Sequence, residues 1–307
     1  MIKYVDSIQY TMDNKKAHYE IGFIGLGIMG KPMVKNLLAN SYNVSFFARR
    51  KNIISEITKL GGKYIDEISK IPKICKLIIL NLPKTKDVHD VVLGENGLYN
   101  SITKNTIIID MSTISPKTTQ TINKKLKLKK SYLLDAPVSG GEIGAINASL
   151  SIMIGGEKKI FNKVKPILKV LGKNLTYVGE SGSGQITKSC NQILVAGTMV
   201  AVSEILLMAE KTGCNLNLIK DALMGGFAQS KILEVHGQRM IEKNYRPGFK
   251  SKLHLKDLDI ALDIAKLAGL DLKGAKYSRK LIRKSVVGKM SDKDSSVLNE
   301  IIKDNNK

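Results

Sequence analysis

Tryptophan is absent from this chain of 307 residues, and cysteine occurs only at Cys75, Cys190 and Cys214. The three cysteines lie far apart without a C-x-x-C spacing, so we expect free thiols in a reducing compartment rather than a disulfide framework. The four histidines are equally scattered, and together with the cysteines they form no zinc-binding pattern. We therefore expect no metal site.

Acidic residues are scarce, with 27 Asp and Glu against 49 Lys and Arg, which gives a formal charge of +22. Such a charge is compatible with binding to nucleic acid or to anionic lipid. However, lysine, asparagine and isoleucine are abundant in every segment, and the densest basic run, Lys124 to Lys130, lies at an expected helix end without interleaved aromatic residues. We interpret the charge as compositional drift and expect no specific nucleic-acid partner.

The N-terminal segment, residues 1–19, has no secretory signal pattern and contains no arginine, unlike a mitochondrial presequence. We expect a loose tail here and a cytoplasmic protein. A second segment, Ile193 to Ala209, is almost continuously apolar and resembles a membrane span in length. Because Glu204 interrupts it and Lys188 precedes it closely, we favour a buried helix between domains and expect no membrane association.

A glycine-rich motif follows the first apolar run of the chain. The run Ile21–Ile24 predicts a strand, and a helix is expected to extend to about Leu38. Between them, Gly25-Leu26-Gly27-Ile28-Met29-Gly30 has the G-x-G-x-x-G spacing that permits a tight turn, close approach to a pyrophosphate, and close packing of helix on strand. With a strand before it and a helix after it, this motif predicts a dinucleotide site.

Apolar runs and helical patterns then alternate, which is typical of a doubly wound parallel sheet with helices on both faces, a Rossmann-type α/β fold. The further strands are expected at Val44–Ala48, Leu77–Leu82, Thr106–Asp110, Tyr132–Leu134, Ser149–Ile154 and Leu175–Val178.

The end of the second strand indicates which nicotinamide cofactor fits. NAD-specific sites usually place Asp or Glu there to bind the ribose 2′-hydroxyl. Here Arg49 and Arg50 take that place, and a guanidinium suits the 2′-phosphate of NADP. We expect NADP to be preferred and NAD to be possible, although in so basic a chain two further cations could also be incidental.

From about residue 183 the strand pattern ends and only helical periodicity remains, punctuated by glycines and Pro247. We therefore predict a cofactor domain over residues 20–182 and an all-α domain over residues 183–307 that begins with a long interdomain helix. Helices are expected at 184–211, 215–224, 228–242, 252–268, 274–287 and 293–303.

Lys188 begins the apolar interdomain helix, which is unusual because an ammonium is costly to desolvate. Asn191 and Gln192 follow at i+3 and i+4 on the same helical face, so the three could hold a carbonyl oxygen and protonate it. No tyrosine is followed by lysine four positions later, so the Tyr-x-x-x-Lys couple of short-chain dehydrogenases is missing. Lys188 is the best remaining proton donor for a dehydrogenase.

Four motifs in order carry a resemblance to a known family. They are the glycine loop, Asp135-Ala136-Pro137-Val138-Ser139-Gly140-Gly141, the Lys188 helix, and His254-Leu255-Lys256-Asp257-Leu258. Across about residues 20–300 the chain resembles the β-hydroxyacid dehydrogenases. Glu142, the pair Asn191-Gln192 and the segment Pro247-Gly248-Phe249 favour members that reduce a small hydroxy-oxo acid over those that oxidise 3-hydroxyisobutyrate. Reduction of glyoxylate or succinic semialdehyde stays open, as does a non-catalytic nucleotide- or nucleic-acid-binding protein with the same fold.

The resemblance implies a role for each matching residue. Lys188 is expected to be the general acid, with Asn191 orienting the substrate or the lysine. The residues expected to bind the small hydroxy- or oxo-carboxylic acid are Ser139, Gly140, Gly141, Thr113, Gln192, Phe249 and Asp257. Those expected to contact the cofactor are Gly25, Leu26, Gly27, Ile28, Met29, Gly30, Arg49, Arg50, Leu82, Pro83, Thr113 and Lys256. A homodimer or homotetramer is also implied.

Each motif has a structural alternative. Ser139-Gly140-Gly141 could be only a tight turn, and the pair Lys256 and Asp257 could lie exposed on a helix and contribute little. Thr113 could simply precede a helix that starts at Ser115. Lys188 could extend its ammonium to solvent. The four motifs together favour the functional interpretation.

Overall fold

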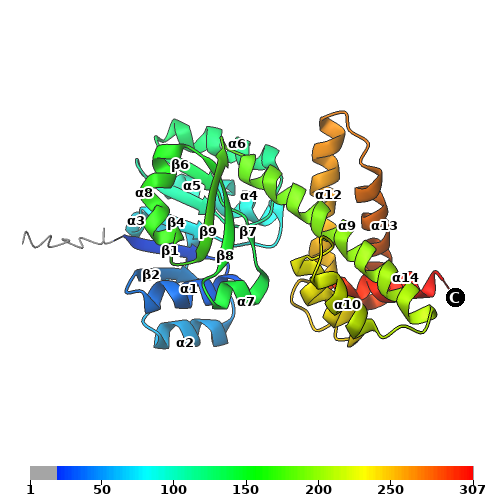
Figure 1. The fold of residues 1–307 in the computed structure, drawn as a ribbon. Coiled ribbons are helices and arrows are strands. Elements are labelled where there is room, and N and C mark those ends of the chain that lie inside the picture. Colours follow the sequence, from blue (N-terminus) through cyan, green and yellow to red (C-terminus); the bar gives the residue numbers. More distant parts are fainter. Residues whose placement is uncertain (1–18, 307) are drawn as a thin grey trace, which may run out of the picture.

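The computed structural model describes residues 19–306, so the tail expected at residues 1–19 lies outside the described residues except for Tyr19. Two bodies are visible in Figure 1, an α/β domain formed by the first half of the chain and a helical domain formed by the second. The long helix α9 (Ser183–Lys211) runs from one into the other. This arrangement confirms the expected fold class.

The α/β domain is built on one sheet with the strand order β3-β2-β1-β4-β5-β6-β8-β7, and β9 also pairs with β8. Strands β1 to β6 are mutually parallel, as predicted. The strands are β1 (Glu20–Ile24), β2 (Asn43–Phe47), β3 (Lys63–Tyr64), β4 (Leu77–Leu80), β5 (Ile107–Asp110), β6 (Tyr132–Asp135), β7 (Val138–Ser139), β8 (Leu150–Gly156) and β9 (Gly172–Gly179).

The sheet departs from the prediction beyond β6. Strand β8 pairs antiparallel with β6 and with β7, so the sheet is not parallel throughout. The two-residue strands β3 and β7 were not predicted, because two residues are too few to show an alternating pattern. The antiparallel addition follows from the chain reversal at Gly140 and Gly141, which connects β7 to α7 and then to β8.

Helices cover both faces of the sheet, and alternate residues of each strand pack against one face or the other. In β4, Leu77 and Ile79 join the core under α1, α2 and α8, whereas Ile78 and Leu80 join the core under α3 to α6. The helices are α1 (Gly30–Ala39), α2 (Lys51–Lys59), α3 (Ile71–Ile74), α4 (Thr85–Leu93), α5 (Leu98–Ser101), α6 (Pro116–Leu128), α7 (Gly141–Ile146) and α8 (Lys158–Leu168).

The second domain is helical in its described residues, and its core forms around α9 from residues such as Met199, Leu206, Leu258 and Ile282. Its remaining α-helices are α10 (Leu216–Met224), α11 (Gln238–Ile241), α12 (Ser251–Leu267), α13 (Lys273–Ser285) and α14 (Leu298–Asp304). Two segments of this domain are π-helical, Leu233–Gly237 and Val286–Met290, and Ser295–Val297 forms a 3-10 turn. The first domain also has a 3-10 turn, at Ile68–Lys70.

The prediction of a regular helix over residues 228–242 is wrong, both in where the helix begins and in its being α-helical throughout. Residues 226–230 are not helical, and the segment Leu233–Gly237 that leads into α11 is a π-helix. Periodicity alone misses such a bulge, because one extra residue per turn hardly changes the apolar pattern.

Helix α9 is long and apolar enough to cross a membrane by length and composition alone. In the structure it packs on β6, β8 and β9 at its start, and on α12, α13 and α14 farther along. Its 29 residues span about 44 Å at 1.5 Å per residue, which is long enough to serve both domains. This matches the interdomain helix that the sequence predicts.

Candidate active site

The glycine loop connects β1 to α1 at the carboxyl edge of the parallel strands. Gly25 has φ of +105°, and a Cβ there would lie 2.2 Å from the carbonyl oxygen of Asn81 in the loop after β4. A Cβ on Gly30 would lie 2.0 Å from the carbonyl oxygen of Gly25. Both positions therefore require glycine, one for the turn and one for the packing of α1 against it.

The same loop has room for an anion where the motif predicts a pyrophosphate. A Cβ on Gly27 would meet no protein atom within 4 Å, and Gly27 and Ile28 are exposed. Helix α1 has Met29 at its N-cap and no side chain capping it. The Lys31 amide donates to the Gly27 carbonyl at 3.1 Å and Pro32 has no N–H, so in the first turn the Gly30 amide is the one left for a ligand. Leu26 is buried beneath the loop. These features fit the phosphates of a dinucleotide.

The two arginines after β2 have different surroundings. Arg50 donates from its Nη2 to the carbonyl oxygen of Leu26 at 3.0 Å, so it holds the glycine loop. Arg49 is exposed, and its guanidinium has no partner among residues 19–306. Arg49 is thus the one that is free to bind a phosphate, a distinction that the sequence does not make.

Ser112 joins the loop after β4, the end of β5 and the start of α9, although no sequence motif singled it out. Its Oγ accepts from the amide of Leu82 at 2.8 Å, and its own amide donates to Asp110 Oδ1 at 3.0 Å. The buried carboxamide of Gln185 in α9 donates to the Ser112 carbonyl at 2.8 Å and accepts from the Ile114 amide at 3.0 Å. The loop that carries Thr113 is thereby fixed to both the β4 loop and the start of α9.

The start of α9 is fixed to the sheet by Asp135, at the end of β6. Its carboxylate accepts from the amides of Gly182 at 2.8 Å and Gln185 at 3.0 Å, which satisfies helix N-terminal donors that lack an intrahelical partner. Burial raises the pKa of Asp135, although these amide bonds oppose the shift. A Cβ on Gly184 would lie 2.8 Å from Asp135 Oδ2, so only glycine allows this approach.

Asp110 is a second buried carboxyl, paired in register with Asp135 across β5 and β6. Burial raises its pKa to about 7, while Ser112 opposes the shift and the neighbouring Asp135 adds to it. Its Oδ2 has no hydrogen-bond partner among the described residues. The carboxyl therefore lies close to half-protonated near neutral pH.

Lys188 is buried in α9, with 7% of its surface exposed, so most of its side chain is withdrawn from solvent. Its ammonium nitrogen is not among the fully enclosed unpartnered atoms and keeps some contact with solvent. Burial lowers its pKa to about 8, Asp257 opposes that shift, and Lys256 adds to it. Within residues 19–306 no hydrogen bond or ion pair to its ammonium is found. Its proton is therefore not committed to an acceptor of the protein.

Lys256 and Asp257 of α12 form a bridge between the domains rather than an exposed helix pair. Lys256 Nζ donates to the carbonyl oxygen of Thr113 at 2.6 Å and lies 2.9 Å from Asp257 Oδ1. The Asp257 side chain is 3% exposed. Asp257 also interacts electrostatically with Lys188, so these two residues of α12, Thr113 and Lys188 lie in one cluster.

The amides that follow Lys188 belong to the same cluster. Gln192 Nε2 donates to Asp257 Oδ2 at 2.7 Å, and Asn191 Nδ2 donates to Gln192 Oε1 at 2.8 Å. His254 Nε2 lies 3.3 Å from the carbonyl oxygen of Gln192, and burial lowers the pKa of His254 to about 4. A neutral His254 therefore donates from Nε2 and holds α12 against α9.

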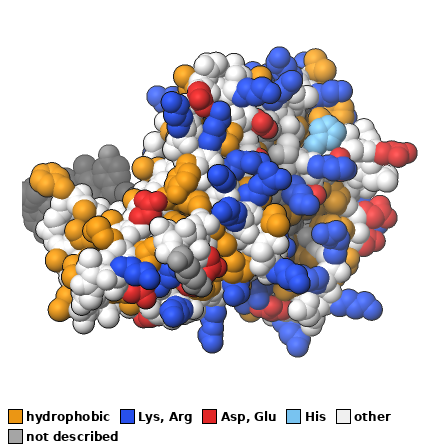
Figure 2. All heavy atoms as spheres, turned by 90° about the vertical axis from the view of Figure 1, so that its right-hand side faces the viewer, with side chains coloured by type: hydrophobic (Ala, Val, Ile, Leu, Met, Phe, Trp, Pro, Cys, Tyr) orange, Lys and Arg blue, Asp and Glu red, His pale blue; other side chains and the backbone are white. Residues whose placement is uncertain are grey.

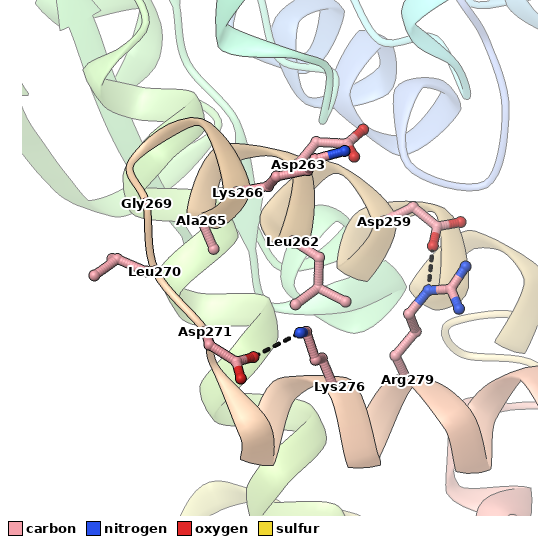
Figure 3. Close-up of a pocket in the computed structure, with 10 residues that line it drawn as sticks. All are labelled: Asp259, Leu262, Asp263, Ala265, Lys266, Gly269, Leu270, Asp271, Lys276 and Arg279. Atoms are coloured by element: carbon pink, nitrogen blue, oxygen red, sulfur yellow. Dashed lines mark hydrogen bonds and ion pairs between the residues drawn. The ribbon is translucent and has the colours of Figure 1, made fainter.

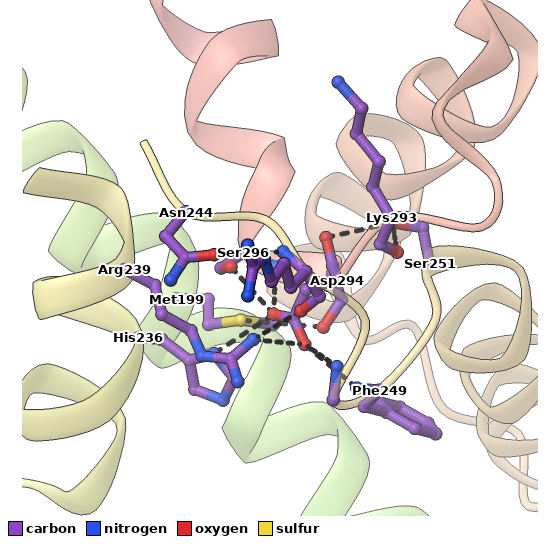
Figure 4. Close-up of polar contacts among 12 residues, drawn as sticks. Met199, His236, Arg239, Asn244, Phe249, Ser251, Lys293, Asp294 and Ser296 are labelled. Carbon is purple, nitrogen blue, oxygen red and sulfur yellow. Dashed lines mark hydrogen bonds and ion pairs between the residues drawn. The ribbon is translucent and has the colours of Figure 1, made fainter. Parts of the chain in front are cut away.

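Phe249 reaches this cluster through the ring of His254, at a centroid distance of 5.3 Å. Its segment is held by Asp294, whose Oδ2 accepts from the amides of Gly248 at 3.1 Å and Phe249 at 2.9 Å (Figure 4). Arg239 lies 3.1 Å from that same oxygen, and His236 lies 3.4 Å from Oδ1.

The position of Asp294 also explains its acidity. Burial would raise the pKa of Asp294, but the nearby His236 ring and hydrogen bonds from the Phe249 amide and Ser296 outweigh burial and hold the pKa well below its usual range. The carboxylate thus stays charged and keeps the Phe249 segment in place. The sequence did not indicate this role, because the residues that meet at Asp294 are separated by about 50 positions.

The turn Ser139-Gly140-Gly141 joins β7 to α7 and has the geometry that only glycine adopts easily. Gly140 has φ of +131° and Gly141 has φ of +62°, and both are exposed. The described contacts of this turn are with Leu150 and Ser151 of β8 rather than with the Lys188 cluster. Its role in binding a carboxylate stays a prediction, as do the cofactor contacts of the loop residues Leu82 and Pro83.

An open cavity of about 660 Å³ lies elsewhere, between α12 and α13. Figure 3 shows the ion pairs Asp259–Arg279 and Asp271–Lys276 at its wall. None of the predicted site residues lines it, so we do not assign the active site to this cavity. Among the described residues no group of three or more His, Cys, Asp or Glu side chains could hold a metal ion.

One face of the molecule carries many basic side chains. In Figure 2, lysine and arginine extend from the top to the bottom of the face shown, with acidic residues between them.

Two family models match almost the whole described chain. The NAD binding domain of 6-phosphogluconate dehydrogenase matches residues 20–179, and the model described as NAD-binding of NADP-dependent 3-hydroxyisobutyrate dehydrogenase matches residues 182–302. Together with the glycine loop, they define the protein as an NAD(P)-dependent oxidoreductase that acts on CH–OH groups.

Comparison with individual relatives identifies a family within this class of oxidoreductases. The 2-hydroxy-3-oxopropionate reductase of Escherichia coli K12 is 42% identical over 91% of this chain and 95% of its own. A chloroplastic glyoxylate/succinic semialdehyde reductase of Arabidopsis thaliana is 29% identical over 92% of this chain and 79% of its own. The structure of the Mycobacterium tuberculosis 3-hydroxyisobutyrate dehydrogenase with L-serine has a TM-score of 0.85 at 25% identity, covering 92% of this chain and 99% of its own. The chain belongs to the β-hydroxyacid dehydrogenase family, which confirms the resemblance drawn from its motifs.

Proposed function

We propose that the protein reduces tartronate semialdehyde (2-hydroxy-3-oxopropanoate) to glycerate with NADPH. The observation that carries the proposal is the buried ammonium of Lys188, which has no acceptor within the described protein and lies one helical turn before Asn191. Its pKa of about 8 leaves most molecules protonated at neutral pH, yet brings the acid close to the working pH of an efficient proton donor.

Each cluster residue has a task in this reaction. When bound at the glycine loop, the nicotinamide cofactor would supply a hydride for the aldehyde carbon. Lys188 gives its proton to the aldehyde oxygen as the negative charge develops there, and Lys256 and Asp257 hold the helical domain against the Thr113 loop. The exposed amides of Gly140 and Gly141, free of side chains, suit the substrate carboxylate. Phe249 would close one side of the substrate space.

Steady-state kinetics with four substrates test the assignment: tartronate semialdehyde, 3-hydroxyisobutyrate, glyoxylate and succinic semialdehyde. We expect the highest kcat/KM for tartronate semialdehyde, which is supported by the 42% identity to a 2-hydroxy-3-oxopropionate reductase. The names of two other relatives favour the alternatives, namely 3-hydroxyisobutyrate and the glyoxylate/succinic semialdehyde pair. If tartronate semialdehyde gave the lowest kcat/KM of the four, the narrow assignment would be wrong.

Cofactor preference depends on the free guanidinium of Arg49. We expect Arg49→Asp to shift the NADPH/NADH ratio of kcat/KM toward NADH by about tenfold or more, because a charged hydrogen bond to phosphate is lost and a repulsive carboxylate is gained. Lys59→Asp, at the exposed far end of α2, makes the same change in net charge and is the matched control. Equal ratios for wild type, Arg49→Asp and Lys59→Asp would remove Arg49 from cofactor recognition.

Two further expectations accompany this proposal. We expect a cytoplasmic enzyme, and a homodimer or homotetramer assembled through the helical domain. Exposed apolar side chains on that domain, such as Leu194 and Met208 of α9, support an assembly surface there. Light scattering at several protein concentrations measures the oligomer number.

A further inference from the structure

Four side chains connect the Thr113 loop to Asn191 in an unbroken line. Lys256 donates to the Thr113 carbonyl and pairs with Asp257 Oδ1, and Gln192 Nε2 donates to Asp257 Oδ2. Asn191 Nδ2 in turn donates to Gln192 Oε1. Asp257 and Gln192 are both 3% exposed, so water does not compete strongly for these bonds.

The charge of Asp257 fixes the direction of the two bonds that lead from it to Asn191. An ionised carboxylate only accepts hydrogen bonds, so Gln192 must turn its NH2 group toward Asp257. The Gln192 carbonyl oxygen then faces Asn191 and only accepts, so Asn191 must turn its own NH2 group toward Gln192. The Oδ1 atom of Asn191 is left as the end of the carboxamide that points away from Gln192, on the helical face that Asn191 shares with Lys188.

We propose that Gln192 is a positioning residue, which transmits the orientation set by the Asp257 carboxylate to Asn191 and so presents Asn191 Oδ1 as a hydrogen-bond acceptor beside Lys188. On this proposal Gln192 acts through its neighbours in the protein, since one N–H of its carboxamide donates to Asp257 and its carbonyl oxygen accepts from Asn191. An acceptor at that point can hold the Lys188 ammonium or a substrate hydroxyl in a single orientation. This inference rests on the proposed reductase function for its consequence in catalysis.

The surroundings of Lys188 define which charges a test must consider. Helix α12 contributes Asp257, which favours the charged ammonium, and Lys256, which disfavours it. His254, also in α12, is buried and interacts with both Lys188 and Asp257. We call the hydrogen-bonded line from Asp257 through Gln192 to Asn191 the relay. Gln192→Met removes the relay without changing any of these charges, whereas Asp257→Asn removes one charge and keeps an acceptor for Gln192.

A double-mutant cycle separates a relay from a local structural role. We expect Gln192→Met to lower kcat/KM for the aldehyde by about tenfold, the size of one lost hydrogen bond, while the Kd for NADPH changes less than about twofold. In an Asn191→Ala background, the same Gln192→Met change should have less than about a twofold further effect, since its target is gone. A full tenfold loss in both backgrounds would show that Gln192 acts independently of Asn191 and would overturn the proposal.

Gln192→Glu is the conservative variant, and it keeps the relay only while the introduced carboxyl is protonated. A protonated carboxyl can donate to Asp257 and still accept from Asn191, whereas two ionised carboxylates at this distance repel. We expect kcat/KM of Gln192→Glu, relative to wild type, to recover as the pH is lowered. A constant ratio across the pH range would contradict the proposal. Cys190→Ser, exposed and about 200° around α9 from Gln192, is the matched control and should follow wild type.

A measurement without catalysis distinguishes failure of the relay from failure of the proposed function. In protein labelled with 15N-asparagine, the Asn191 side-chain NH2 signal is identified by its loss in Asn191→Ala. We expect this signal to be protected from hydrogen exchange in wild type and to lose its protection in Gln192→Met. If the wild type reduces none of the four substrates but Gln192→Met still loses the protection of the Asn191 signal, the relay is supported and the proposed function is wrong. Equal protection in both proteins overturns the relay whatever the activity.

Discussion

Lys188→Met is expected to abolish most of the reductase activity and at the same time to stabilise the protein. Loss of a general acid lowers kcat by about 10² to 10⁴-fold. The wild-type ammonium is buried with a pKa of about 8, against 10.5 in the unfolded chain, so its charge costs about 3 kcal/mol of folding free energy at neutral pH. Methionine fills similar space without that cost, and NADPH should still bind.

The sign of the pH dependence follows from the lowered pKa of Lys188. Below pH 8 the amine is charged in both states, so the destabilisation is fully present in the wild type. Between about pH 8 and 10.5 the folded protein loses the proton before the unfolded chain does, and the wild type gains stability. The Tm advantage of Lys188→Met should therefore be largest at neutral pH and shrink toward pH 10.5. For the same reason kcat/KM for reduction should fall above about pH 8.

Lys303→Met provides the matched control. Lys303 has 19% of its side chain exposed, but its ammonium pairs with Glu210 at 2.6 Å. Removing a paired lysine should leave activity unchanged and bring no gain in stability. Calorimetry measures Tm, and steady-state kinetics measures kcat, for the wild type, Lys188→Met and Lys303→Met. Unchanged kcat in Lys188→Met would remove Lys188 from the role of acid, and a lower Tm would show that its ammonium is better solvated than its burial indicates.

Gly30→Ala and Gly27→Ala are expected to separate folding from cofactor binding within one motif. The new Cβ of Gly30→Ala would lie 2.0 Å from the carbonyl oxygen of Gly25, a backbone atom that cannot move without shifting β1 or α1. We expect a loss of about 1–3 kcal/mol in stability, together with weak NADPH binding.

The second variant leaves the protein itself undisturbed. The new Cβ of Gly27→Ala meets no protein atom within 4 Å, so stability should be kept or rise by about 0.4–1 kcal/mol. The methyl group occupies the space where the backbone approaches the pyrophosphate, so the Kd for NADPH should rise about tenfold or more. Thermal denaturation and NADPH fluorescence titration measure the two effects. The interpretation of the loop fails if Gly27→Ala binds NADPH as wild type does.

The sequence was sufficient for features that are encoded locally. The G-x-G-x-x-G loop lies between a strand and a helix as predicted, and Gly25 and Gly30 prove sterically necessary. The buried strands β4 and β5 follow directly from their continuous apolar runs. The interdomain helix was expected from residue 184 and begins at Ser183. In each case the local pattern of residues is enough to predict the backbone geometry.

The short strand β7 and the antiparallel direction of β8 depend on pairings that no local pattern encodes. In the same way, the sequence identified Lys188 as a costly charge but could not show whether it would be buried or extend into solvent. That was decided by α12, which brings Lys256 and Asp257 from almost 70 residues away and closes over α9.

For the same reason, the sequence did not show how the residues that fix the site act. Four residues act through backbone amides and carbonyl groups of distant segments, namely Ser112, Gln185, Asp135 and Asp294. A hydrogen bond to a backbone group does not require any particular side chain at the partner residue, so the sequence does not reveal the pair. The sequence by itself therefore determined the fold class and the glycine loop, and it singled out Lys188 as the predicted proton donor. Only the tertiary structure decided the environment that lowers the pKa of that lysine and the hydrogen bonds that orient its neighbours, because burial and hydrogen-bond direction arise where separate segments meet.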